Sequence, residues 1–383
     1  MPLRVDVQPR LLEWALTRSR RREKVEARFD QLPAWLSGEK RPTLKQLESF
    51  ASATRTAVGY LFLPEPPDEP MPIEDFRTVG SAGLASMSPD LLDTIYLCQR
   101  RQAWYEEHAQ TVGIDPVAFV GKATVKDDPA ETARRIAKTI GFTAAERETA
   151  KNWEVAFRLM VERVEQAGVL VMVSGVVGSN THRPLDPEEF RGFALADAMA
   201  PLIFVNGADT KAGQMFTLAH ELAHLWLGES GVSDAGAGTF STRRIERWCN
   251  AVAAEVLVPL DDLLKGTGEG DPLASVDRLR RRFKVSSLVI LRRLHDAGRL
   301  KRAAFEAAYS AEQRLLVARA KARRTDGGDY YNTQPVRLSR RLTRAVIAST
   351  YEGHTLFTEA FDLLSVKKEQ TLRELGHRLE VLG

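Results

Sequence analysis

The chain has 383 residues, of which 44% are hydrophobic and 27% are charged. This length predicts two or three domains, and the composition is typical of a globular protein. The formal net charge is only +3, because 54 Lys and Arg nearly cancel 51 Asp and Glu, so overall charge does not identify a nucleic-acid binder. No apolar run approaches the roughly 20 residues that span a bilayer, and the N-terminus lacks a signal-peptide pattern. We therefore expect a cytoplasmic protein with no membrane partner.

Two cysteines, Cys98 and Cys249, are too few for a disulfide framework. This number agrees with a reducing compartment. Both are predicted to be buried thiols.

Residues 1–63 show the pattern of several short helices. Thr43 and Gln46 in "RPTLKQLESFA" predict a capping box at the start of one helix. A basic run precedes them, and such runs are usually solvated helix faces. Its members could also contact phosphates, and they are Arg18, Arg20, Arg21, Arg22 and Lys24. The proline-rich stretch 64–72 then ends the segment, because proline sustains neither helix nor sheet.

Residues 73–165 alternate helical patterns with turn signals, which predicts a helical connector. Three short β-type runs follow, and they are "GVLVMVSG" (168–175), "FRGFALAD" (190–197) and "PLIFVN" (201–206). They predict a small sheet directly before a long helix. The third run fits two interpretations equally: an edge strand to which an extended substrate adds, or an inner strand.

The long helix contains "FTLAHELAHLWLG" (216–228). Asp209 or Thr210 can cap its start, and Gly228 can end it. Leucines at helical spacing form an apolar stripe on one face. His220 and His224 lie one turn apart on another face, so both imidazoles can bind one ion.

A catalytic zinc usually has three protein ligands and one open position. Glu221, beside the histidine pair, can act as a general base on water without being a ligand. The alternative is an ordinary core helix in which the motif occurs by chance. The placement of the motif on a capped amphipathic helix after β-strands favours the zinc site.

The third ligand must come from elsewhere, and Glu246 and Glu255 on the next helix are the candidates. Nine positions are about half a helical revolution, so only one of the two can face the ion. Glu246 shares its face with small residues that allow close helix packing, which favours Glu246. Asn250, one turn further, could orient a ligand, although a structural role is as common. His182 lies in a loop and is a candidate transition-state donor.

In these motifs the chain resembles the ImmA/IrrE family of zinc-dependent metallopeptidases, in the form fused to an N-terminal XRE-like helix-turn-helix. The resemblance rests on "FTLAHELAHLWLG", on "IERWCNAVAAEVLVP" and on the strands before the helix, over about 165–300. In the family pattern the third ligand precedes a Cys-Asn pair, which implies Glu246 ahead of Cys249 and Asn250. The resemblance also implies Zn²⁺ as cofactor and a regulatory protein as substrate.

The predicted fold class is α+β: a mostly helical multi-domain chain with a minimal zincin-like peptidase domain that contains a small mixed β-sheet. The expected domains are an XRE-like module (1–63), a linker (64–72), a helical connector (73–165), the peptidase domain (166–300) and a C-terminal helical domain (301–383).

The function implied by the resemblance is cleavage of a transcriptional repressor or other regulator in a stress or mobile-element response. The alternative is an antitoxin-like regulator whose zinc domain is structural or sensory. DNA binding by the first domain is an open expectation, because Pro33 lies inside the expected recognition helix. Residues 279–300 and 358–379 also have helix-turn-helix spacing, with plain helical packing as the alternative. The sequence leaves the oligomeric state open.

Overall fold

The computed structural model of the protein describes residues 3–70, 72–75, 87–233, 244–268, 270–322 and 337–382. The chain forms two compact units, Met1–Pro72 with Ala82–Tyr96 and Ile73–Ser81 with Leu97–Gly383. Among the described residues, no helix is both long and apolar enough to cross a membrane.

The first unit is helical. Its elements are α1 (Pro9–Ser19), α2 (Arg22–Glu26), α3 (Leu32–Leu36), α4 (Leu44–Thr54) and the 3-10 helix η1 (Val58–Phe62). Leucines of α1, α3 and α4 form its core together with Trp35 and Phe50. The predicted capping box of Thr43 and Gln46 is confirmed at the start of α4. Pro33 lies in the first turn of α3, where its missing N–H breaks no helical hydrogen bond.

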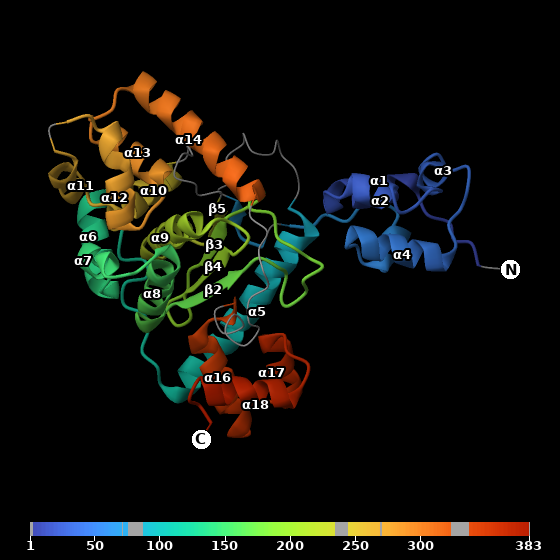
Figure 1. The fold of residues 1–383 in the computed structure, drawn as a ribbon. Coiled ribbons are helices and arrows are strands. Elements are labelled where there is room, and N and C mark those ends of the chain that lie inside the picture. Colours follow the sequence, from blue (N-terminus) through green and yellow to red (C-terminus); the bar gives the residue numbers. More distant parts are fainter. Residues whose placement is uncertain are drawn as a thin grey trace. The chain divides into compact units, whose positions relative to one another are not determined.

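The second unit contains a mixed five-stranded sheet in the order β1-β5-β3-β4-β2. Figure 1 labels the four strands β5, β3, β4 and β2 in this order. The strands are β1 (Glu74–Asp75), β2 (Leu170–Ser174), β3 (Gly192–Leu195), β4 (Leu202–Asn206) and β5 (Gly231–Ser233). β3 runs antiparallel to both β4 and β5, whereas β2 is parallel to β4 and β1 is parallel to β5.

The three strands predicted from the sequence are confirmed as β2, β3 and β4. The edge-strand interpretation of residues 201–206 is wrong, because β4 lies between β3 and β2. All five β4 residues are buried, as expected for a strand with neighbours on both sides and helices on its face. The outer edge of β3 is instead paired with β5, which the sequence did not predict.

Helix α9 (Lys211–Leu227) carries the histidine motif and packs on β3 and β4 (Figure 1). Thr210 caps its start by accepting a hydrogen bond of 3.1 Å from Gly213 N, and Gly228 ends it at a φ of 75°. Gly228 fits this end because a left-handed backbone suits a residue without Cβ. Helix α10 (Arg244–Leu257) packs against α9.

The remaining helices up to residue 322 follow in chain order. They are α5 (Pro89–Val112), α6 (Pro129–Ile140), α7 (Ala144–Glu148), α8 (Trp153–Gln166), α11 (Leu260–Thr267), η2 (Leu273–Ser275), α12 (Val276–Phe283), α13 (Ser287–Asp296) and α14 (Arg302–Ala322). Ile136 of α6 and Phe157 of α8 share one hydrophobic core with α9 and α10. Both cysteines are confirmed as buried free thiols.

The last three helices are α16 (Arg340–Tyr351), α17 (Phe357–Leu364) and α18 (Glu369–Arg378). Buried Arg101 of α5 holds α17 by donating to Leu363 O at 2.8 Å and to Ser365 Oγ at 3.1 Å. Glu165 of α8 accepts hydrogen bonds from Ser339 Oγ and, at 3.5 Å, from Arg341 N at the start of α16. The C-terminal helices are therefore fixed to the same body as the sheet by buried polar contacts.

Candidate metal centre

Helix α9 presents two imidazoles to one point. His220 and His224 are one turn apart, and their Nε2 atoms lie 3.1 Å from each other. Both side chains are fully buried. The leucines of the same helix belong to the core that fixes its rotation, and Leu218, Leu222 and Leu225 are its buried members. The apolar stripe thus sets the direction in which the histidines point.

Helix α10 brings a carboxylate to the same point. Glu246 Oε1 lies 3.0 Å from His224 Nε2, and Glu246 Oε2 lies 3.3 Å from His220 Nε2. Ligand atoms about 2.1 Å from a tetrahedral zinc are about 3.4 Å from one another. Among the described residues, His220, His224 and Glu246 form the group whose ligand atoms can hold a metal ion. Their types and spacing fit zinc.

The charges of the three residues are coupled. Burial alone would raise the pKa of Glu246, but the charges and hydrogen bonds of the two histidines outweigh burial and lower it. Burial would lower the pKa of His220, yet the carboxylate of Glu246 raises it above its ordinary value. The pKa of His224 is lowered, chiefly by burial. A buried carboxylate against two imidazoles is a site arranged for a cation.

Glu221 lies beside this group on the same helix. Its Oε1 accepts a hydrogen bond from Ser233 Oγ of β5. Its Oε2 is buried and has no hydrogen-bond partner among the described residues. Burial raises the pKa of Glu221 to about 8, against the opposing charge of His220 and the hydrogen bond from Ser233. One carboxylate oxygen is thus oriented by the protein, and the buried second oxygen can act on a substrate or water once the site is opened.

Asn250 and Glu255, the other two residues of α10 considered for this site, have different neighbours. Asn250 Oδ1 is 3.1 Å from His220 Nδ1, which orients the ring so that Nε2 faces the metal position. Glu255 pairs with Arg293 at 2.8 Å and accepts a hydrogen bond from Leu260 N at 3.0 Å. The two glutamates of α10 therefore face different neighbours, as the helical spacing predicted.

Gly192 of β3 allows the close contact between the sheet and α9. A Cβ at this position would lie 2.5 Å from Thr217 Cγ2, 2.8 Å from Phe204 O and 3.2 Å from Glu221 Oε1. Sequence reasoning missed both Gly192 and Ser233. No local signal marks them, since each acts through a contact with a distant part of the chain.

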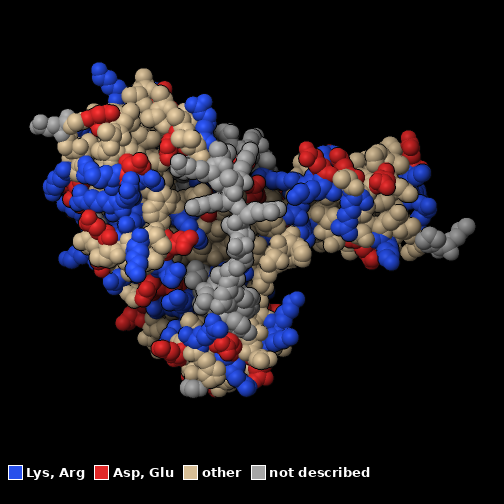
Figure 2. Space-filling model, viewed as in Figure 1, with Lys and Arg blue, Asp and Glu red and all other residues tan. Residues whose placement is uncertain are grey.

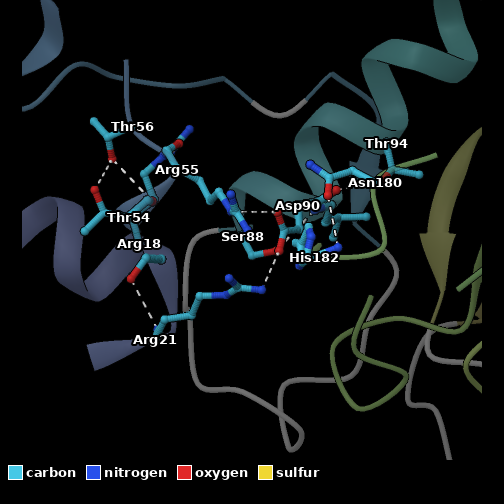
Figure 3. Close-up of polar contacts among 12 residues, drawn as sticks. Arg18, Arg21, Thr54, Arg55, Thr56, Ser88, Asp90, Thr94, Asn180 and His182 are labelled. Carbon is cyan, nitrogen blue, oxygen red and sulfur yellow. Dashed lines mark hydrogen bonds and ion pairs between the residues drawn. The ribbon is translucent and has the colours of Figure 1, made fainter. Parts of the chain in front are cut away.

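His182 and the basic run lie outside this group. His182 is exposed, whereas the metal centre is buried. In the first unit, Arg18 pairs with Glu69, Arg21 Nη2 lies 3.5 Å from Asp90 Oδ2 (Figure 3), and Arg22 pairs with Glu13. Lys24 is exposed, and Arg20 adopts a left-handed backbone at the end of α1. Phosphate binding by these residues and a transition-state role for His182 remain predictions.

The predicted second helix-turn-helix corresponds to α12 and α13. Lys and Arg side chains gather on the face where α12 lies, with acidic residues among them (Figure 2). Most of α13 is buried, including Arg293, which also donates to Val258 O at 3.0 Å. This packing agrees with the alternative of plain helical packing for that segment.

The fold and the site define a metallopeptidase-like domain. Residues 164–295 match the model of a peptidase family described as the IrrE N-terminal-like domain. Residues 338–378 match a second model, described as a domain of unknown function (DUF8813). Comparison with the curated proteins gives no match. The XRE-like assignment of residues 1–63 remains a prediction.

Proposed function

We propose that this protein is a zinc-dependent metalloendopeptidase that cleaves a regulatory protein, in particular a transcriptional repressor. The observation that carries the proposal is the convergence of His220, His224 and Glu246 beside Glu221. A purely structural zinc site is closed by four protein ligands and has no use for a buried carboxylate next to them. Three ligands and a neighbouring base are the set that hydrolysis requires.

Some residues of the site would bind the metal, and Glu221 would transfer the proton. When bound by His220, His224 and Glu246, zinc supplies Lewis acidity that polarises a carbonyl and acidifies water. Asn250 holds the tautomer of His220 that leaves Nε2 free for the metal. Glu221 Oε2 accepts the proton of the attacking water and passes it to the departing amide nitrogen. Ser233 keeps Glu221 Oε1 engaged, so that the other oxygen carries out this transfer.

The regulatory substrate rests on the resemblance to the ImmA/IrrE family, so it needs a test in cells. The protein is co-expressed with each regulator encoded next to it, and cleavage products are sought by immunoblot and mass spectrometry. We expect one regulator to be cut by the wild type and to remain whole with Glu221→Gln. The variant must contain as much zinc as the wild type, which shows that the metal centre is intact. Equal regulation of target genes by both proteins would favour a structural or sensory role of the zinc domain.

A further inference from the structure

β3 lies close to Glu221, and its outer edge is the one that does not pair with β4. Gly192 of β3 packs so closely on α9 that a Cβ there would be 3.2 Å from Glu221 Oε1. An extended chain paired with this edge therefore passes beside the general base. Adding a strand to a sheet edge is a common way for a protein to bind an extended peptide.

This edge already has an occupant from the same chain. β5 pairs antiparallel with β3 through Gly192↔Ser233, Phe193↔Val232 and Ala194↔Gly231. Ser233 of β5 reaches the carboxylate of Glu221 with its hydroxyl group. β5 thus places the Ser233 hydroxyl group next to Glu221, at the position that a bound substrate would take.

The occupant fills its site closely. Val232 and Ser233 have no exposed surface, and Gly231 is also buried. The metal centre beneath them is equally closed, since His220, Glu221 and His224 have no exposed surface and Glu246 has 1%. The metal centre must therefore become exposed before a substrate can bind there. β5, which pairs with β3 and contacts Glu221 through Ser233, is the element that has to move.

The described pairing of β5 is short. Among the described residues, β5 comprises three positions, and on its other side it pairs with the two residues of β1, at Glu74↔Gly231 and Asp75↔Val232. By contrast, β2 at the opposite end of the sheet pairs with β4 over five residues. Short strands with few ladder partners are drawn from the less stable part of a fold.

We propose that β5 is a displaceable stand-in for the substrate, and that the edge of β3 binds an extended peptide of the same chemistry. This peptide runs antiparallel to β3 and carries a small residue, a β-branched aliphatic residue and a small hydroxylated residue at the positions of Gly231, Val232 and Ser233. The inference rests on the proposed peptidase function, because that function is what makes the bound peptide a substrate. Binding of a peptide to the β3 edge can nevertheless be measured without cleavage.

Val232→Asp puts a charge into the buried site of Val232 and should expel β5 from the edge. We expect the folded variant to keep its zinc and most of its thermal stability, while the amides of Phe193 and Ala194 lose protection from hydrogen exchange. A peptide with the sequence of residues 229–233 should restore that protection, and a scrambled peptide should not. Val171→Asp in β2 is the matched control, because Val171 is as buried but belongs to an integral strand. It should unfold the domain.

The milder Val232→Thr variant serves if the buried charge proves too disruptive. It keeps the shape of the side chain, so we expect an unchanged fold and binding of the same peptide that is tighter by several-fold, because the resident strand competes less well. Peptide affinity is measured in the Glu221→Gln background, where cleavage does not interfere. Equal affinities of this variant and its parent would overturn the proposal, as would unfolding of Val232→Asp to the same extent as Val171→Asp.

The two proposals fail in different ways. Binding of the peptide without any cleavage by the Glu221-containing protein would leave the β3 edge as a docking site and contradict the peptidase function. Cleavage of substrates with no preference for an aliphatic residue at the Val232 position would leave the peptidase function intact. It would contradict the proposal that β5 mimics the bound substrate.

Discussion

Glu246 Oε1 lies 3.0 Å from His224 Nε2, although 22 positions separate the two residues in the chain. The contact exists because α10 packs against α9 and turns Glu246 toward the histidine pair. Glu255 of the same helix instead pairs with Arg293. This relationship defines the proposed ligand set and makes it testable.

The purified protein should bind about one zinc per chain, and loss of any of the three ligands should weaken binding strongly. The changes are His220→Ala, His224→Ala and Glu246→Ala, with metal content measured by mass spectrometry after dialysis. Glu255→Gln is the control and should keep the metal. Retention of zinc by Glu246→Ala together with its loss in Glu255→Gln would show that the third ligand is assigned wrongly.

Asn250→Ala should weaken zinc binding by about 10- to 100-fold, the usual effect of losing a group that orients a ligand. The reason is that His220 Nδ1 would lose its acceptor and the ring would no longer be fixed. Zinc affinity is measured by competition with a chelator. Asn250→Asp is the control, because it keeps an acceptor at the same place and should bind more tightly than the alanine variant. No difference between the two would assign Asn250 a packing role instead.

Gly192→Ala should destabilise the protein by about 1–3 kcal/mol, since the added methyl group overlaps Thr217 and the backbone of Phe204. It should also lower activity by pushing Glu221 away from β3. Thermal unfolding and peptide cleavage are the measurements. Gly59→Ala is a suitable control, because a Cβ there meets nothing within 4 Å. A fully active and stable Gly192→Ala protein would contradict the close approach of β3 and α9.

The C-terminal helices should respond to pH through Glu165. Burial raises its pKa to about 7 from 4.5, against the hydrogen bond from Ser339. The folded state therefore holds this proton more tightly than the unfolded state, so the stabilisation is complete below pH 4.5 and is lost as pH rises toward 7. Glu165→Gln removes this dependence and should raise the free energy of unfolding at pH 8, relative to wild type, by at most about 3 kcal/mol. The free energy of unfolding of both proteins is measured by chemical denaturation at pH 4 and pH 8. The same difference between wild type and variant at both pH values would contradict the raised pKa of Glu165.

Much of the metal centre could be predicted because its signals are local. The spacing of His220 and His224 belongs to one helix, and the caps at Thr210 and Gly228 mark its ends. Helical geometry showed that only one of Glu246 and Glu255 can face the ion, and the small residues on the face of Glu246, together with the family resemblance, favoured Glu246. The strands β2, β3 and β4 were long enough to show a β-type pattern.

Other features depend on tertiary contacts that leave no pattern in the sequence. Within the described residues, β1 and β5 have two and three residues, too few for any periodicity to appear. The position of β4 inside the sheet follows from how strands pair, which the sequence left open between two alternatives. The contact between Ser233 and Glu221 arises only because β5 turns back onto β3 after α9.

Cleavage of a peptide library by zinc-loaded protein, with and without Glu221→Gln, tests the metallopeptidase function most directly. The wild type and Val232→Asp are included together, so that a closed site does not hide activity. The account predicts zinc-dependent cleavage that falls by about 10²- to 10⁴-fold in Glu221→Gln, because a positioned general base is lost while its size is kept, and zinc content stays the same. No cleavage by either Glu221-containing protein at full zinc content, or equal cleavage with Glu221→Gln, would contradict it.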